Sequence, residues 1–190
     1  MKAFMFMVIL LFAFMACLAP ELTAKNKADQ KARAIIEINR MAYEANRKIE
    51  FERFRDDLRF SESPDWKKIN SIGCMGWFQF QQATLDYLGY GYITPERFSK
   101  FPEIFPKELQ VELFTDLIGC NEIALKDYMI YIGSTINGVT ITKSGLLAGS
   151  HLGGANGVIL FLESNGTENN RDINRTSIAD YLRKFQGYGI

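Results

Sequence analysis

The sequence predicts a mainly α-helical single domain with at most one short β-hairpin, preceded by a signal peptide. Apolar residues recur at three- and four-residue spacing over long segments, which is the period of one helix face. β-branched residues gather in residues 135–142 around the pair Asn137-Gly138, which favours a tight hairpin turn. Roughly 165 residues follow the leader, enough for one core and too few for two ordinary domains.

The leader is residues 1–24. Lys2 precedes an almost unbroken apolar run over residues 4–14, with small residues after it. This run is shorter than the ~20 apolar residues that span a bilayer, so it is typical of a secretory signal and not of a membrane helix.

Two cleavage sites fit this leader. Cleavage after Ala24 predicts a soluble exported protein whose domain is residues 25–190. A lipoprotein signal that ends at Ala16 is the alternative, and it would leave Cys17 for lipid attachment to a membrane. Both alternatives place the protein outside the cytoplasm, in the periplasm or at the outer membrane of a bacterium.

A long first helix is predicted from about Lys27 to Leu58, ending at or shortly before Glu62. Pro64 follows, and proline disfavours helical backbone in the residue before it, so Glu62 should lie near a helix end. The apolar face of this helix consists of Ile35, Ile38, Met41, Ala42, Ala45, Ile49, Phe54 and Leu58.

Two further helices are predicted in the middle of the chain. Residues 77–88 have a helical period that Gly89 ends. Three prolines punctuate the connector that follows, and residues 107–132 then predict a second long helix.

Three shorter helices are predicted after the hairpin, over residues 144–152, 155–162 and 176–185. Ser177 with Asp180 three residues later resembles a capping box at the start of the last helix.

The composition argues against several classes of function. Lys plus Arg and Asp plus Glu are both 22, so the formal charge is zero and nucleic-acid binding is not expected. The single histidine gives a cysteine and histidine zinc site too few ligands, and no metal or cofactor is expected. Cys74 and Cys120 remain after the leader, and whether they form a disulfide stays open.

The strongest candidate for chemistry is an acid followed by a glycine-aromatic turn. Glu62-Ser63 precedes the segment Gly73-Cys74-Met75-Gly76-Trp77-Phe78-Gln79. An acid that cleaves a glycosidic bond must hold a proton near neutral pH, which apolar neighbours favour. Phe60, Met75, Trp77 and Phe78 are expected to cover Glu62, and the glycines would let the backbone pass close to a bulky polymer.

These motifs, in this order, resemble the soluble type of lytic transglycosylase, a lysozyme-like family that acts on bacterial peptidoglycan. In that family a Glu-Ser pair closes the first cleft helix, and a Gly-x-Met-Gly-x-x-Gln turn follows. Residues 148–154 and Tyr181 stand at the places of its later motifs, and the resemblance covers about Leu58 to Tyr188. Ser150 and His151 depart from the pattern, because the family usually has Tyr and Asn there.

The resemblance implies a lysozyme-like fold with Glu62 as its one catalytic acid. Glu62 would protonate the bond between N-acetylmuramic acid and N-acetylglucosamine, then take a proton from the C6 hydroxyl and close a 1,6-anhydro ring without water. Tyr181 would steady the acid through its hydroxyl. The implied substrate contacts are Ser63, Met75, Gly76, Trp77, Gln79, His151 and Tyr181. Glycan strands of peptidoglycan are the implied partner, with a secretion or conjugation machine as a second.

Two alternatives stay open. Hydrolysing glycosidases usually need two carboxylates, and Asp65 in the loop after Glu62 is the best second acid, so a muramidase is the first alternative. A glycan-binding or scaffold protein weakened by the departure at Ser150 and His151 is the second.

Overall fold

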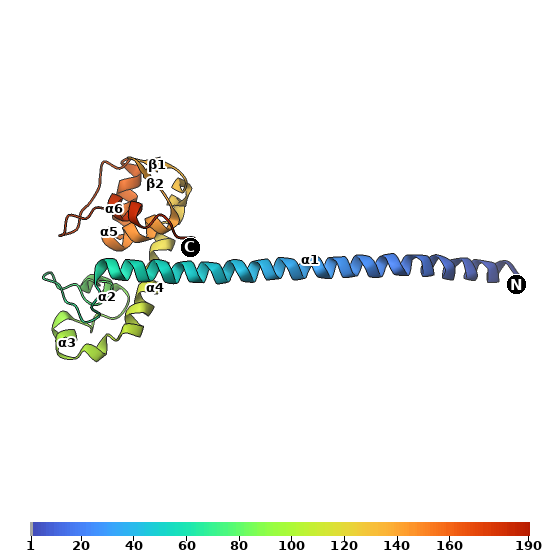
Figure 1. Cartoon of the computed structure of the whole chain (residues 1–190), viewed down its shortest axis with the longest axis horizontal. Coiled ribbons are helices and arrows are strands. Elements are labelled where there is room, and N and C mark those ends of the chain that lie inside the picture. Colours follow the sequence, from blue (N-terminus) through green and yellow to red (C-terminus); the bar gives the residue numbers. More distant parts are fainter. Residues whose placement is uncertain (1) are drawn as a thin grey trace. The chain divides into compact units, whose positions relative to one another are not determined.

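A computed structural model describes the backbone of residues 2–190 and the side chains of residues 26–190 (Figure 1). The predicted signal peptide, residues 1–24, and the lipidation alternative at Cys17 lie outside the described side chains. The fold is mainly helical with one two-stranded sheet, which confirms the predicted mainly α class. The chain divides into two compact units, residues 1–47 and 48–190.

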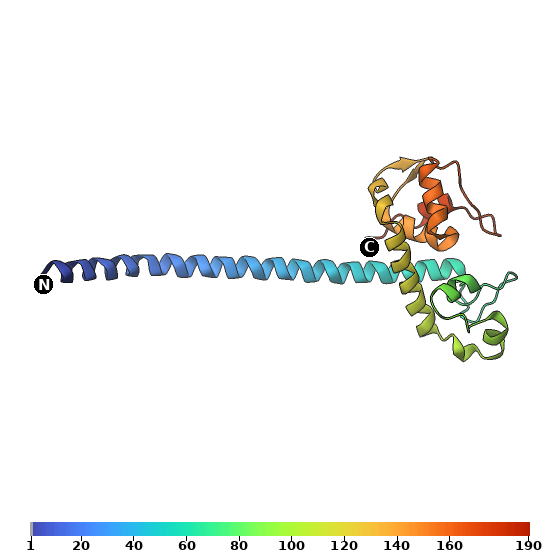
Figure 2. The same ribbon diagram turned by 180° about the vertical axis from the view of Figure 1, so that it is seen from behind.

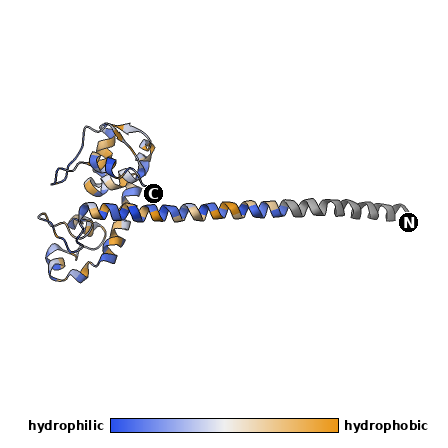
Figure 3. Cartoon of the chain, in the orientation of Figure 1, coloured by the Kyte–Doolittle hydropathy of each residue, from blue (hydrophilic) through white to orange (hydrophobic). Residues whose placement is uncertain are grey.

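The first unit is the N-terminal part of helix α1 (Lys2–Glu62). Every described side chain of residues 26–47 is exposed, and hydrophilic and hydrophobic residues alternate along this length (Figure 3). Arg40 pairs within the helix with Glu37 at 2.5 Å and with Glu44 at 2.7 Å. The compact unit with a buried core therefore starts at Lys48, whereas the sequence prediction starts the domain at residue 25.

The second unit contains the end of α1 and every later element. In chain order these are α2 (Gln82–Tyr87), α3 (Pro95–Lys100), a 3-10 helix (Pro102–Ile104), α4 (Lys107–Ala124), a second 3-10 helix (Lys126–Tyr131), β1 (Thr135–Ile136), β2 (Val139–Thr140), α5 (Lys143–Glu163) and α6 (Ile178–Lys184). Within this unit, α4 runs from the part that holds α2 and α3 to the part that holds the hairpin, α5 and α6 (Figures 1 and 2).

Two buried clusters form the core of this unit. The first includes Phe54 of α1, and Phe78 stacks on Phe114 of α4 with ring centroids 4.2 Å apart. The second surrounds Phe161 of α5 and joins this helix to the hairpin and α6. Helix α5 is long and apolar enough to cross a membrane, but more than half of it is buried inside this core, so we interpret it as a core helix.

The predicted helix over residues 77–88 is wrong in its first half. Met75 pairs with Phe80 in an antiparallel bridge, and the chain reverses between them because Gly76 and Gln79 adopt left-handed backbone with φ of 78° and 49°. Aromatic residues at helical spacing therefore lie on a tight turn, and α2 begins only at Gln82. The predicted helix over residues 107–132 is too long, since α4 ends at Ala124 and a 3-10 helix follows.

Three local predictions are confirmed. Asn137 and Gly138 have φ of 48° and 71°, the positive values that a two-residue hairpin turn of type I′ requires. The two helices predicted over residues 144–162 are separated by a kink at Gly154, where φ is 71° and ψ is 162°. Ser177 and Asp180 form the predicted capping box at the start of α6.

Candidate active site

Glu62 is the last residue of α1, as the sequence predicts. Ser63 makes the final backbone bond of the helix, to Arg59 at 2.9 Å. The helix stops here because the next residue, Pro64, has no backbone N–H to donate. The side chain of Glu62 is 16% exposed and lines a pocket of about 860 Å³. The pocket contains residues of α1, of the loop after it, of α5 and of α6, all within the second unit.

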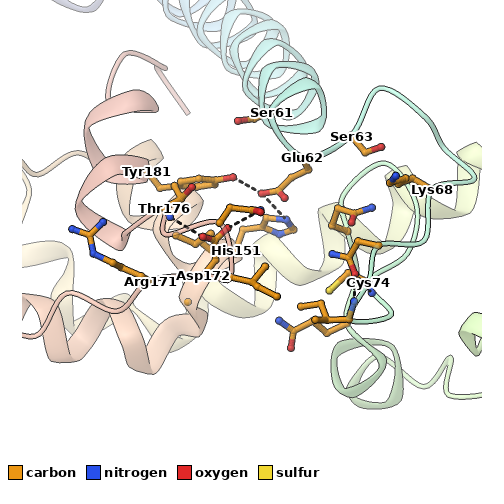
Figure 4. Close-up of a pocket in the computed structure, with 18 of the residues that line it drawn as sticks. Ser61, Glu62, Ser63, Lys68, Cys74, His151, Arg171, Asp172, Thr176 and Tyr181 are labelled. Atoms are coloured by element: carbon orange, nitrogen blue, oxygen red, sulfur yellow. Dashed lines mark hydrogen bonds and ion pairs between the residues drawn. The ribbon is translucent and has the colours of Figure 1, made fainter.

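Tyr181 of α6 donates a hydrogen bond from its hydroxyl to Oε1 of Glu62, with the two oxygens 2.5 Å apart (Figure 4). Burial of the phenol and the adjacent carboxylate both raise the pKa of Tyr181 well above its usual value. The phenol therefore keeps its proton across the physiological range, and this proton is available to Glu62.

His151 of α5 reaches Glu62 from a second direction, with Nε2 3.9 Å from Oε1 (Figure 4). Nε2 also lies 3.0 Å from the carbonyl oxygen of Phe78, and since a carbonyl can only accept, Nε2 carries the proton. Burial lowers the pKa of His151, although Glu62 and the Phe78 carbonyl partly oppose this shift. The ring is thus neutral at pH 7, and its Nδ1 is buried without a hydrogen-bond partner among the described residues.

The turn after Gly73 is held by a glutamine that the sequence did not indicate. Gln110 of α4 is fully buried and accepts a hydrogen bond from the backbone nitrogen of Trp77 at 2.7 Å. Its amide group donates to the carbonyl oxygens of Trp66 and Phe105 at 2.9 and 2.8 Å. A Cβ at Gly76 would lie 2.5 Å from Oε1 of Gln110, so the close approach as well as the positive φ requires glycine.

The structure brings five of the eight predicted site residues together in the pocket. These are Glu62, Ser63, Gln79, His151 and Tyr181. The amide of Gln79 donates to the carbonyl of Gly76 at 2.8 Å, so its polar end also stabilises the turn.

The other three predicted residues lie elsewhere. Met75 is fully buried in the core, and Gly76 is buried against Gln110. Trp77 lies outside the pocket and donates its indole proton to the carbonyl of Pro64 at 3.3 Å. Phe60, expected to cover the acid, is 62% exposed, because residues two apart on a helix point in different directions.

Three more carboxylates line the pocket, but each is bonded to nearby backbone. Asp65 accepts from the backbone nitrogen of Lys67 at 3.0 Å, and Asp172 accepts from that of Thr176 at 2.7 Å. Asp180 accepts from Ser177 in the capping box. Among the described carboxylates of the pocket, Glu62 is distinguished by its bond to a side chain from a distant helix.

Sequence reasoning missed the loop over residues 170–174, which lines the pocket beside Lys184. The Asp172 carboxylate accepts a hydrogen bond from the backbone nitrogen of Thr176, four residues further along the chain, so a short-range bond closes the end of this loop. The Lys184 ammonium donates to the hydroxyl of Ser61.

Cys74 and Cys120 are free thiols, which answers the question that the sequence left open. Cys74 lines the pocket, and burial raises the pKa of its thiol, with a smaller contribution from Glu62. Ser150, by contrast, is buried and bonds back to the Leu146 carbonyl at 2.7 Å, so His151 is the member of this pair that faces the pocket.

Comparisons of the chain with protein-family models, with curated proteins and with solved structures find no match. The chain is a mainly helical protein with a pocket in which one carboxylate accepts a hydrogen bond from a tyrosine.

Proposed function

We propose that the protein is a lytic transglycosylase with a lysozyme-like helical fold that cleaves peptidoglycan at the N-acetylmuramic acid to N-acetylglucosamine bond. The observation that carries the proposal is the placement of Glu62 at the end of α1, mostly buried, in a pocket of about 860 Å³, and bonded to Tyr181. A pocket of this size is typical of small-ligand sites and accommodates sugar rings.

The chemistry follows from one carboxyl group used twice. Protonated Glu62 gives its proton to the glycosidic oxygen as the bond from C1 to that oxygen breaks. The C6 hydroxyl oxygen of the same muramic acid then bonds to C1, and its proton returns to Glu62, so that no water is consumed. The Tyr181 hydroxyl stabilises the ionised carboxylate between the two transfers, because a donated hydrogen bond favours the charged form.

The neutral His151 supports this arrangement. A histidinium 3.9 Å from Glu62 would hold the carboxylate ionised and oppose its role as an acid, whereas a neutral imidazole does not. The ring also fixes the Phe78 carbonyl beside the turn, which orients one wall of the site.

The test is a digest of purified sacculi by the wild type and by Glu62→Gln. We expect the wild type to release fragments with 1,6-anhydro ends. Glu62→Gln has nearly the same shape and no transferable proton, so release should fall at least about a hundredfold, consistent with the loss of general acid catalysis. Equal release by both proteins would contradict the proposal.

A muramidase is the second candidate, because Asp65 lines the same pocket as Glu62. In that case Asp65 would activate a water and the products would carry reducing ends. Asp65→Asn separates the two functions: a muramidase would lose most of its activity, while the transglycosylase keeps it.

Export to the periplasm, with or without a lipid on Cys17, is part of the proposal, since the substrate lies outside the cytoplasm. The proposal also includes a partner: the protein would associate with a secretion or conjugation machine that must open the cell wall.

A further inference from the structure

A cluster of cations and aromatic rings lies beside the pocket and outside it. We call it the cation–aromatic surface; it consists of Arg59, Phe60, Trp66, Lys67, Trp77 and Lys107. Both tryptophans of the chain belong to it. Its members come from the end of α1, the loop after it, the glycine-aromatic turn and the start of α4, so the fold and not a local motif brings them together.

Cations and rings alternate across this surface. The guanidinium carbon of Arg59 lies 4.4 Å from the Trp77 ring centre and 4.2 Å from that of Phe60. The Lys107 ammonium lies between the two tryptophans, 5.3 Å from Trp77 and 5.8 Å from Trp66. Lys67 covers Trp66 at 5.0 Å. Each positive charge lies close to an aromatic ring, and the cation–π attraction between them keeps the charge in a defined place.

Two of these charges have no counter-ion among the side chains that the structure describes. Arg59 has Asp56 at 3.8 Å, but among residues 26–190 no carboxylate lies within ion-pair distance of the ammonium groups of Lys67 or Lys107. Both lysines are exposed. An external anion can therefore bind them without breaking an ion pair.

The cation–aromatic surface lies close to Glu62. Arg59 lies one helical turn before Glu62, and Trp77 is bonded to Pro64, two residues after it. A glycan strand held at Glu62 carries peptide stems on its muramic acids, and these stems bear carboxylates. Resting on the proposed function, we propose that the cation–aromatic surface binds the carboxylates of peptide stems, so that the substrate is peptide-bearing peptidoglycan in preference to bare glycan.

The test compares the wild type with a double variant that carries both Lys67→Gln and Lys107→Gln. Two preparations are used: intact sacculi, and glycan strands from which an amidase has removed the stems. Sedimentation with each preparation measures binding, and release of anhydro fragments in the same tubes measures turnover. A matched control carries Lys100→Gln with Lys126→Gln, which removes the same charge from exposed lysines outside the surface.

We expect the double variant to bind intact sacculi roughly fivefold or more weakly, since each exposed charge contact contributes modestly. Added salt should reduce wild-type binding to the variant level, and Lys67→Arg with Lys107→Arg should restore it. Stripped strands should bind equally to all four proteins.

Unchanged binding of the double variant to intact sacculi would overturn the inference, as would an equal loss on stripped strands. Binding to phosphatidylglycerol vesicles that depends on the two lysines, without an effect on sacculi, would assign the surface to a membrane instead. If the wild type binds but releases no fragments, the proposed function fails while the stem inference is still decided by the binding data.

Discussion

At the scale of single residues, the site depends on what surrounds one oxygen of Glu62. Tyr181 donates to Oε1, and the protonated nitrogen of His151 lies 3.9 Å from the same atom. Both partners are uncharged at pH 7, so they position the carboxyl group through a hydrogen bond and a polar contact and not through an ion pair.

Tyr181→Phe removes the donated bond and keeps the ring. We expect fragment release to fall roughly tenfold to a hundredfold, because hydrogen bonds to charged groups are the strong ones. Tyr188→Phe is the matched control: its hydroxyl donates to Asp57 at 2.7 Å, away from the pocket, and burial together with this bond raises the pKa of Tyr188 to about 12. If the two variants lose equal activity, the Tyr181 bond has no special role.

His151 makes stability depend on pH. Its pKa is lowered in the folded state by burial, so the unfolded chain binds the extra proton more readily, and stability falls as pH drops below the unfolded pKa of ~6.5. The loss is at most about 1.4 kcal/mol per pH unit. Since it is the only histidine, His151→Asn should remove this slope between pH 7.5 and 5.5 in urea unfolding. Parallel slopes in both proteins would contradict the assignment.

At the scale of elements, the turn over residues 75–80 matters most, because it links α4 to the pocket wall. Gly76→Ala should destabilise the protein by about 1–2 kcal/mol for the positive φ and by about 1–3 kcal/mol more for the contact with Gln110. Gly89 has a similar positive φ of 85°, but a Cβ there would meet nothing within 4 Å, so Gly89→Ala should show only the first contribution. Chemical denaturation measures the free energy of unfolding of both variants. Equal losses would mean that the Gln110 side chain moves aside at little cost.

The same turn shows what sequence reasoning can and cannot reach. The end of α1 before Pro64, the Asn137-Gly138 turn and the Ser177 capping box were predictable, since each is decided by residues a few positions apart. The turn was not, because it depends on Gln110, which lies 33 residues beyond Trp77.

In the candidate site, the residue types and a family resemblance predicted Glu62, His151 and Tyr181, and the structure places these three residues in one pocket. Nothing in the local pattern could indicate that Met75 is buried or that Trp77 lies outside the pocket. Aromatic residues can have the same spacing on a helix face, in a cleft wall and in a buried turn. Contacts with residues far away in the sequence decide which of these forms.

At the scale of the whole molecule, the two units predict separable behaviour. Residues 26–47 are exposed throughout, whereas the C-terminal end closes onto α1 within the second unit, where Gly189 donates to Glu50 at 3.2 Å. A chain that begins at Lys48 should therefore unfold at the same urea midpoint as a chain that begins at residue 25. A clear drop in the midpoint would show that the first unit stabilises the second.

In the proposed reaction, the carboxyl group of Glu62 both gives and retrieves the proton, and no water takes part. Digestion of sacculi in water enriched in oxygen-18, followed by mass spectrometry of the released fragments, tests it most directly. We expect anhydro ends that carry no label from the solvent. Reducing ends that contain one labelled oxygen would contradict it and identify a hydrolase.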